Sequence, residues 1–113
     1  MEKFMLIFQG GGQQQRSPEE MQANMGKWMA WIDKLAKAGK YVSGEPLLKG
    51  GKLIKGGPDQ VTDGPYTEGK EIVGGYFIIN AAGYDEAVAL CADYPEYSAG
   101  GSIQVRQVMK MNM

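Results

Sequence analysis

The sequence contains no histidine and a single cysteine, Cys91. Histidine is the commonest general base near neutral pH, so its absence removes imidazole-based zinc sites and nucleophile pairs of the Ser-His or Cys-His type. One cysteine cannot form a disulfide within the chain, which fits a protein of a reducing compartment. Cys91 lies in an apolar stretch, which is typical of a small core residue. We therefore expect no metal site and no cofactor, and any acid–base chemistry must use carboxylates, lysine or tyrosine.

Charge and hydropathy exclude further classes of protein. The net charge is −1 and no cluster of basic residues occurs, so the sequence offers no positively charged region to bind the phosphates of a nucleic acid. The apolar run at residues 4–8 is too short for a signal peptide, and no stretch approaches transmembrane length. We expect a cytoplasmic protein with no membrane partner, built as one domain over residues 1–113.

The first half of the chain predicts a strand followed by a long helix. Residues 4–8 read as a buried strand that ends at a run of glycines. Ser17 is placed to cap a helix, with Pro18 in the first helical position and Glu20 closing a capping box. The helix is expected to run to about residue 38, where Gly39 provides the stop.

Spacings of four and three residues along this helix predict one apolar stripe that faces the core. The stripe consists of Met21, Met25, Trp28, Ile32 and Leu35. Trp31 lies roughly 90° from the centre of that stripe, at the rim of the buried face. A tryptophan in that position either covers the edge of the core or lies at a pocket mouth or subunit contact.

The remainder of the chain predicts three strands, a hairpin and a second helix. Residues 40–48 begin as a strand, whose later half is reduced to an edge or bulge by Gly44 and Pro46. Glycine-rich turns around residues 53–54 predict a short hairpin. The other expected elements are a strand at 72–80, a helix from 84 or 85 to 94 and a final strand from 103 to 112.

This order of elements predicts an α+β fold. It fits the ferredoxin-like βαββαβ plan with an inserted hairpin, in which two helices cover one face of an antiparallel sheet. Residues 4–8 and 76–79 nevertheless carry apolar side chains on both faces of their strands. The face without helices must meet another apolar surface, so we predict a homodimer in which two such sheets pack face to face.

One stretch combines turn residues with charge. Asp63, Gly64 and Pro65 form strong turn punctuation, and a cluster of charged residues follows before a buried strand. The stretch at 63–71 reads Asp-Gly-Pro-Tyr-Thr-Glu-Gly-Lys-Glu and resembles the YCII-related family, in particular its DGPF branch. Tyr66 stands where that branch has phenylalanine, and Gly69 where threonine is frequent. The resemblance covers essentially the whole chain.

The resemblance implies a dimeric α+β barrel but no settled activity. Relatives in the wider YCII group resemble enzymes with a His-Asp pair in a cleft, and this chain has no histidine to supply that pair. Proteins of the DGPF type are also associated with transcription initiation through proximity to sigma factors, which is an association and not a mechanism.

Asp63 is the first candidate for a functional residue, either as a base or as a polar anchor at the lip of a cleft. An Asx turn that holds Gly64 and Pro65 in shape is the simpler interpretation of the same residue. The further candidates for ligand binding are Tyr66, Glu68, Lys70, Trp31, Arg106, Ser43 and Glu45. Arg106 is suited to an anionic group, although a surface ion pair is its more ordinary role.

Two functions of different classes follow from these patterns. The first is a small dimeric protein that binds a small polar ligand in a cleft beside the Asp-Gly-Pro-Tyr loop, or a cofactor-independent lyase or isomerase that uses the same cleft. The second is a non-enzymatic interaction module linked to sigma-factor-dependent transcription. A closed pocket around Asp63 with a perturbed pKa favours the first, and an exposed, locally satisfied Asp63 favours the second.

Overall fold

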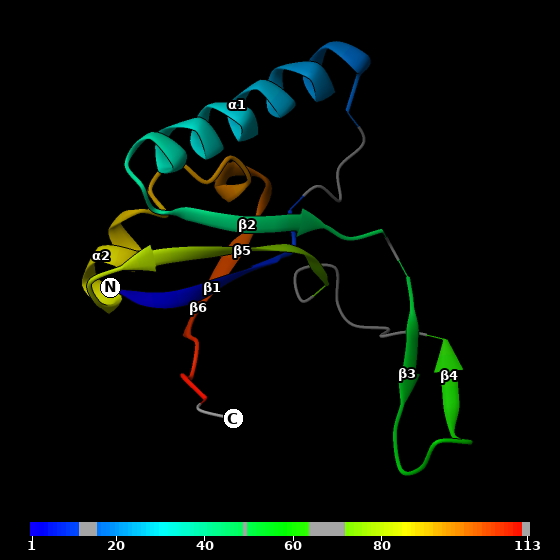
Figure 1. Cartoon of the computed structure of the whole chain (residues 1–113). Coiled ribbons are helices and arrows are strands. Elements are labelled where there is room, and N and C mark those ends of the chain that lie inside the picture. Colours follow the sequence, from blue (N-terminus) through cyan, green and yellow to red (C-terminus); the bar gives the residue numbers. More distant parts are fainter. Residues whose placement is uncertain (12–15, 49, 64–71, 112–113) are drawn as a thin grey trace.

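The computed structural model describes residues 1–11, 16–48, 50–63 and 72–111. The main layer is a four-stranded antiparallel sheet, covered on one face by the long helix and by the segment that follows the short helix (Figure 1). The elements in chain order are β1 (Glu2–Gln9), α1 (Pro18–Lys37), β2 (Tyr41–Pro46), β3 (Lys52–Ile54), β4 (Val61–Asp63), β5 (Val73–Ala81), α2 (Tyr84–Ala89), η2 (Tyr97–Ala99) and β6 (Ser102–Gln107).

The order of strands in the main sheet is β2-β5-β1-β6, with every neighbouring pair antiparallel. This is the ferredoxin-like arrangement, and it confirms the α+β class and the βαββαβ plan. Among the described residues no further strand pairs with either edge of the sheet, so the closure of two sheets into a barrel stays a prediction. Strand β2 lies at an edge of the sheet, as predicted, but its irregularity falls between Tyr41 and Ser43 and not in the later half at Gly44 and Pro46.

The start and end of α1 confirm the capping signals in the sequence. The Ser17 side chain accepts a hydrogen bond from the Glu20 backbone N–H, and the Glu20 carboxylate accepts one from the Ser17 N–H, both at 3.1 Å. These contacts satisfy backbone donors that have no partner inside the helix. At the other end Gly39 takes φ +75°, the left-handed conformation that glycine adopts without strain.

The buried face of α1 differs from the predicted stripe. Met21 and Met25 are each 60% exposed, whereas Trp31, expected at the rim, is buried with 1% exposed. The inward stripe runs through Asn24, Trp28, Trp31 and Leu35. Counting apolar residues gives methionine and tryptophan equal weight, but a buried indole removes far more surface from water. The polar Asn24 also lies on the inner side because a buried carboxylate accepts its hydrogen bond.

The two faces of the sheet are unequal. On the face toward the helices, here called the covered face, Phe4, Leu6, Phe8, Phe77 and Ile79 are buried. Phe8 packs against Trp28, Trp31, Phe77 and Tyr94 with ring centroids between 4.9 and 5.8 Å apart. On the opposite side, here called the open face, the central residues Met5, Ile7, Tyr76 and Ile78 are half-buried.

The second helix is shorter than predicted. It ends at Ala89 and not at residue 94, and the chain continues in tight turns. The N–H groups of Cys91, Ala92 and Tyr94 bond to carbonyls three residues back, so the last predicted turns are of the 3₁₀ type. The tighter path still buries Cys91 and Tyr94, while Tyr84 and Val88 of the predicted stripe are exposed. The last strand is also shorter than predicted and ends at Gln107.

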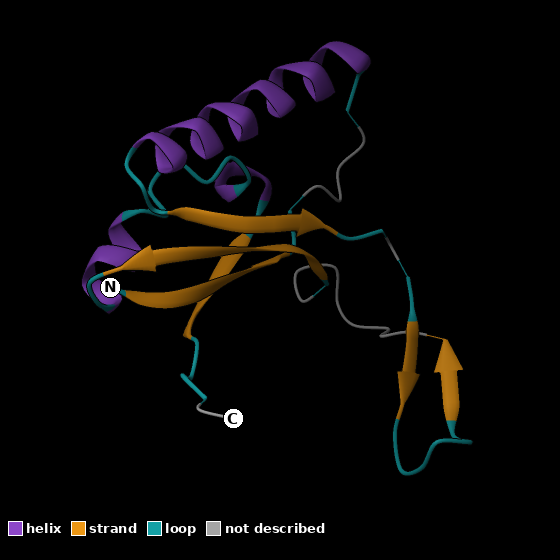
Figure 2. Cartoon of the chain, in the orientation of Figure 1, coloured by secondary structure: helices purple, strands orange, loops and turns teal. Residues whose placement is uncertain are grey.

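The predicted hairpin is a small sheet of its own. Strands β3 and β4 pair with each other in a two-stranded sheet, separate from the main one (Figure 2). We call residues 50–63 the arm. In Figure 1, α1 lies above the main sheet and the arm runs downward, on the side of the sheet away from α1.

Candidate functional site

Asp63 lies at the end of β4, on the arm. Its carboxylate is exposed and forms an ion pair with Lys52, the residue opposite it on β3. Of the other candidates in this stretch, Tyr66, Glu68 and Lys70 lie outside the described residues. The structure thus places Asp63 in a cross-strand pair on the surface, an arrangement that contributes little to stability.

Three further candidates share the open face of the main sheet. Ser43 and Glu45 on β2 are opposite Ile78 and Tyr76 of β5, while Arg106 on β6 is opposite Met5. Residues directly opposite each other point to the same side of a sheet. Arg106 donates to the Gln104 side chain at 3.0 Å and forms no ion pair within the described residues.

These candidates do not converge within one chain. Strands β2 and β6 are the two edges of the sheet, so Glu45 and Arg106 are three strand spacings apart across the sheet, about 14 Å, and are also offset along the strands. Trp31 lies on the other side of the sheet, in the core. The open face therefore carries polar candidates at both edges and half-buried apolar residues between them.

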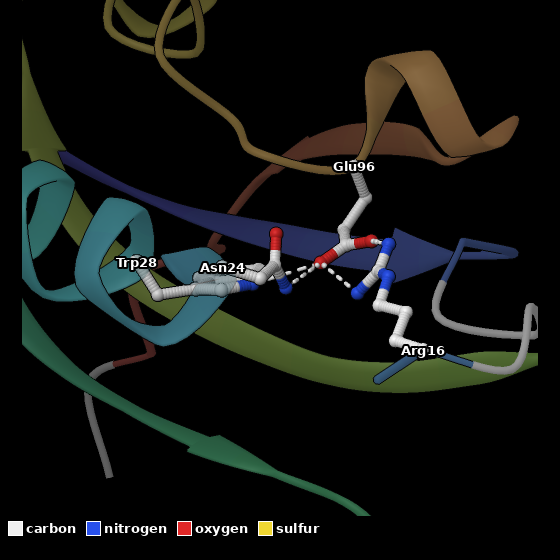
Figure 3. Close-up of polar contacts among 4 residues, drawn as sticks. All are labelled: Arg16, Asn24, Trp28 and Glu96. Carbon is white, nitrogen blue, oxygen red and sulfur yellow. Dashed lines mark hydrogen bonds and ion pairs between the residues drawn. The ribbon is translucent and has the colours of Figure 1, made fainter. Parts of the chain in front are cut away.

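A polar cluster that sequence analysis missed lies under α1, centred on Glu96 (Figure 3). Glu96 is the buried charged residue of the described chain, with 6% of its surface exposed. Arg16 donates to its Oε1 at 2.7 Å and to its Oε2 at 3.5 Å. Asn24 and Trp28 donate to Oε2 at 2.7 and 3.0 Å. The carboxylate thus connects the segment around Glu96 to the start of α1, at sequence separations of 68 to 80 positions.

Local sequence explains how this cluster forms. Asn24 and Trp28 are four residues apart, so their side chains lie on the same face of α1. Two glycines permit the approach of the Glu96 backbone and side chain: a Cβ at Gly11 or at Gly101 would lie 2.8 Å from the Glu96 Cβ. Gly11 also has φ +62°, which a side chain rarely tolerates.

The electrostatics of the cluster fix the charge of Glu96. Burial alone would raise the pKa of this carboxyl, but the hydrogen bonds from Arg16, Asn24 and Trp28 outweigh it and lower the pKa to about 2. Hydrogen bonding of this kind favours the ionised form. At neutral pH Glu96 is therefore an anion that accepts hydrogen bonds, and it is a poor general acid or base.

The other buried groups nearby are also unsuited to proton transfer at neutral pH. Burial raises the pKa of the Cys91 thiol to about 11, and burial together with the Glu96 charge raises that of Tyr94 to about 12. Both side chains are therefore protonated at neutral pH and neither is an activated nucleophile. In the described parts of the chain, no three acidic or cysteine side chains gather to hold a metal ion.

A surface groove adjoins the cluster, between α1 and the segment at 92–98. Its volume is about 490 Å³ and it is open to solvent. Lys34 at its rim forms an ion pair with Asp93 at 2.7 Å. Trp31 and Tyr94 form its floor but are almost completely buried. The groove is shallow and Asp63 does not line it. It is therefore not the closed pocket that was expected around Asp63.

One signal in the sequence points to this cluster. A polar residue, Asn24, lies on the helical side that also carries both tryptophans, and a buried amide needs a partner. Nothing local identifies Glu96 as that partner, because the two residues are 72 positions apart.

Neither of the two helices in the described chain has the length and apolar character needed to span a membrane.

The comparisons with known proteins concern the fold and the family. No curated protein sequence matches the chain. Among solved structures, it is similar to 5-chloro-2-hydroxyhydroquinone dehydrochlorinase (TftG) from Burkholderia phenoliruptrix AC1100, in complex with 2,5-dihydroxybenzoquinone. The TM-score is 0.48 and the identity 20%, over 94% of this chain and 93% of that one. The profile of the YCII-related domain matches residues 3–112. The chain therefore belongs to the YCII-related domain family.

Proposed function

We propose that this chain, as a protein of the DGPF branch of its family, forms a homodimer through the open face and binds a small polar ligand there, without catalysing a reaction. The observation that supports this proposal is the pattern of the open face. Its centre is apolar and half-buried, with Met5 and Ile7 on β1 beside Tyr76 and Ile78 on β5. Neither helix of the described chain covers these side chains, and a second copy would remove them from water.

Opposite charges at the two edges favour a symmetric pair. Glu45 lies on edge strand β2 and Arg106 on edge strand β6, on the same face. In a two-fold dimer, a contact from one copy to the other is repeated in reverse, so Glu45 of each copy can meet Arg106 of its partner. The same guanidinium is suited to a carboxylate or phosphate group of a ligand, since it donates two parallel hydrogen bonds.

The absence of a poised acid or base in the described chain supports binding over catalysis. Glu96 is ionised, Cys91 and Tyr94 are protonated, and Asp63 is exposed beside Lys52. General acid–base catalysis works best with a group whose pKa lies near the working pH. The pKa values of Glu96, Cys91 and Tyr94 do not meet that requirement.

The oligomeric state tests the first half of the proposal. We expect the wild-type protein to sediment as a dimer and the variant Ile78→Asp to sediment as a monomer with unchanged circular dichroism. Single charge reversals, Glu45→Arg or Arg106→Glu, should weaken the dimer, and the double reversal should restore it. A wild-type protein that stays monomeric at high concentration contradicts the proposal.

Ligand screening tests the second half. We expect small carboxylates or phosphates to raise the melting temperature of the wild type. Arg106→Ala should abolish that shift at a protein concentration high enough to keep the variant dimeric. Turnover of any such compound, followed by NMR, would favour the lyase or isomerase alternative. A dimer that no compound stabilises would favour the interaction module linked to transcription.

A further inference from the structure

The arm exposes apolar side chains that its own chain leaves uncovered. Ile54 and Val61 face each other across the two strands and are 62% and 47% exposed. Every hydrogen bond found for the described residues 50–63 joins two residues of the arm, as between Lys55 and Gln60. A two-stranded sheet with three-residue strands is at best marginally stable in water. The arm therefore requires a partner surface to keep this conformation.

The open face alone is small for a stable interface. Pairing of the four strands places about twelve residues on it. A specific, stable interface uses roughly 20–30 residues on each partner. Sheet-to-sheet packing thus leaves a deficit that another surface of the chain has to supply.

The arm is continuous with that face and lies on the correct side of the sheet. It follows β2, and the Leu47 N–H bonds to the Gly74 carbonyl at 2.9 Å where the arm leaves the sheet. From there it runs to the side away from α1, which is the side where a second copy would pack on the open face (Figures 1 and 2).

We propose that the two copies exchange arms: the Ile54–Val61 face of each arm packs against the body of the other copy and extends the interface between the sheets. This inference depends on the proposed homodimer. Because the dimer is symmetric, each arm contact occurs twice. The two arms therefore add buried area and help to fix how the two sheets are aligned, which flat sheets alone define weakly.

The test is a pair of variants on opposite faces of the arm, studied in the full chain. Ile54→Asp places a charge on the proposed contact face, and the matched control Thr62→Asp places the same charge on the other face. Since each substitution is present twice, we expect Ile54→Asp to raise the dimer dissociation constant by about 100-fold or more. Thr62→Asp should change it by less than about threefold.

Hydrogen exchange provides a second readout that does not need a variant. Amides of β3 and β4 in the wild type should be protected above the dissociation constant of the dimer and unprotected below it, because an isolated two-stranded sheet is only marginally stable.

The outcomes separate this inference from the proposal on which it depends. A dimer that Ile54→Asp leaves intact, with arm amides unprotected at all concentrations, overturns arm exchange and leaves the sheet-to-sheet dimer standing. Equal weakening by Ile54→Asp and Thr62→Asp also overturns it, since the effect would then be one of charge and not of a contact face. A wild-type protein that is monomeric contradicts both the homodimer and the exchange of arms.

Discussion

Phe77 and Ile78 are neighbours on β5, yet they belong to two different environments. Phe77 lies on the covered face, 6% exposed, in contact with the rings of Phe8 and Trp31. Ile78 points to the open face and is half-buried. The covered face is completed by the chain itself, whereas the centre of the open face is apolar and no helix of the described residues covers it. The first therefore specifies the fold, and the second specifies what the folded chain meets.

The largest expected difference between the two faces is in their response to truncation. Phe77→Ala should lower the free energy of unfolding by about 3–5 kcal/mol, because it leaves a cavity among packed rings. Ile78→Ala should cost less than about 1.5 kcal/mol for the monomer and show its main effect as a dependence on protein concentration. Urea denaturation at two protein concentrations measures both. Equal, concentration-independent losses would mean that the two faces are not distinct.

Glu96→Gln tests the polar part of the covered face. The variant removes the charge that Arg16 neutralises and to which Asn24 and Trp28 donate hydrogen bonds, and it turns an amide N–H₂ toward these donors. We expect a loss of about 3 kcal/mol, in line with breaking a buried ion pair. The matched control is Asp93→Asn, which breaks the exposed pair with Lys34 and should cost less than about 1 kcal/mol. A Glu96 variant as stable as this control would show that the cluster is not structural.

The effect of Glu96→Gln on the free energy of unfolding should depend on pH. The pKa of Glu96 falls from 4.5 to about 2 on folding, so its stabilising effect is complete above about pH 4.5 and is lost as the pH falls through about 2. A shift of this size corresponds to roughly 3 kcal/mol. The gap in stability between wild type and Glu96→Gln should therefore be constant near neutral pH and narrow below pH 4.5. Denaturation in urea at several pH values measures it, and a gap that persists to pH 2 would contradict the assignment.

Gly101→Ala tests how closely the chain approaches itself behind Glu96. An added Cβ would lie 2.5 Å from the Tyr94 hydroxyl and 2.9 Å from the Glu96 carbonyl oxygen. We expect a loss of about 1–3 kcal/mol, typical of overpacking. Gly26→Ala is the control, since a Cβ there meets nothing within 4 Å and lies inside α1. It should stabilise the protein by about 0.5–1 kcal/mol, and thermal melts of the two variants should shift in opposite directions.

The smallest effect is expected at Asp63, the residue that sequence analysis ranked first. Asp63→Asn removes an exposed ion pair with Lys52 and should change the free energy of unfolding by less than about 0.5 kcal/mol. Chemical denaturation is the measurement. A loss of several kcal/mol would mean that Asp63 has partners beyond the arm and would restore it as a structural centre.

The parts of the fold that the sequence predicted are those encoded locally. The capping box at Ser17 and Glu20, the stop at Gly39 and the arm all follow from residues within a few positions of one another. The strand order followed from the sequence of elements, since few topologies satisfy it.

The parts that sequence missed depend on contacts between distant segments. The rotation of α1 about its axis places Trp31 inward and Met25 outward, and a pattern of apolar residues alone does not distinguish these two orientations. Glu96 reads as one charged residue in a polar segment, and only the fold brings Arg16 to it from 80 positions away. Buried polar groups are the residues for which hydropathy gives the wrong expectation.

Both tryptophans of the chain lie on the covered side, so tryptophan fluorescence reports selectively on that side of the sheet. The Trp28 indole donates to Glu96 and the Trp31 indole to the Leu90 carbonyl, so their emission reports on the packing beneath α1. The open face contributes Tyr76, and neither this face nor the arm contributes a tryptophan. Tryptophan fluorescence will therefore follow unfolding closely, while association of two copies through the far side of the sheet will leave the signal almost unchanged.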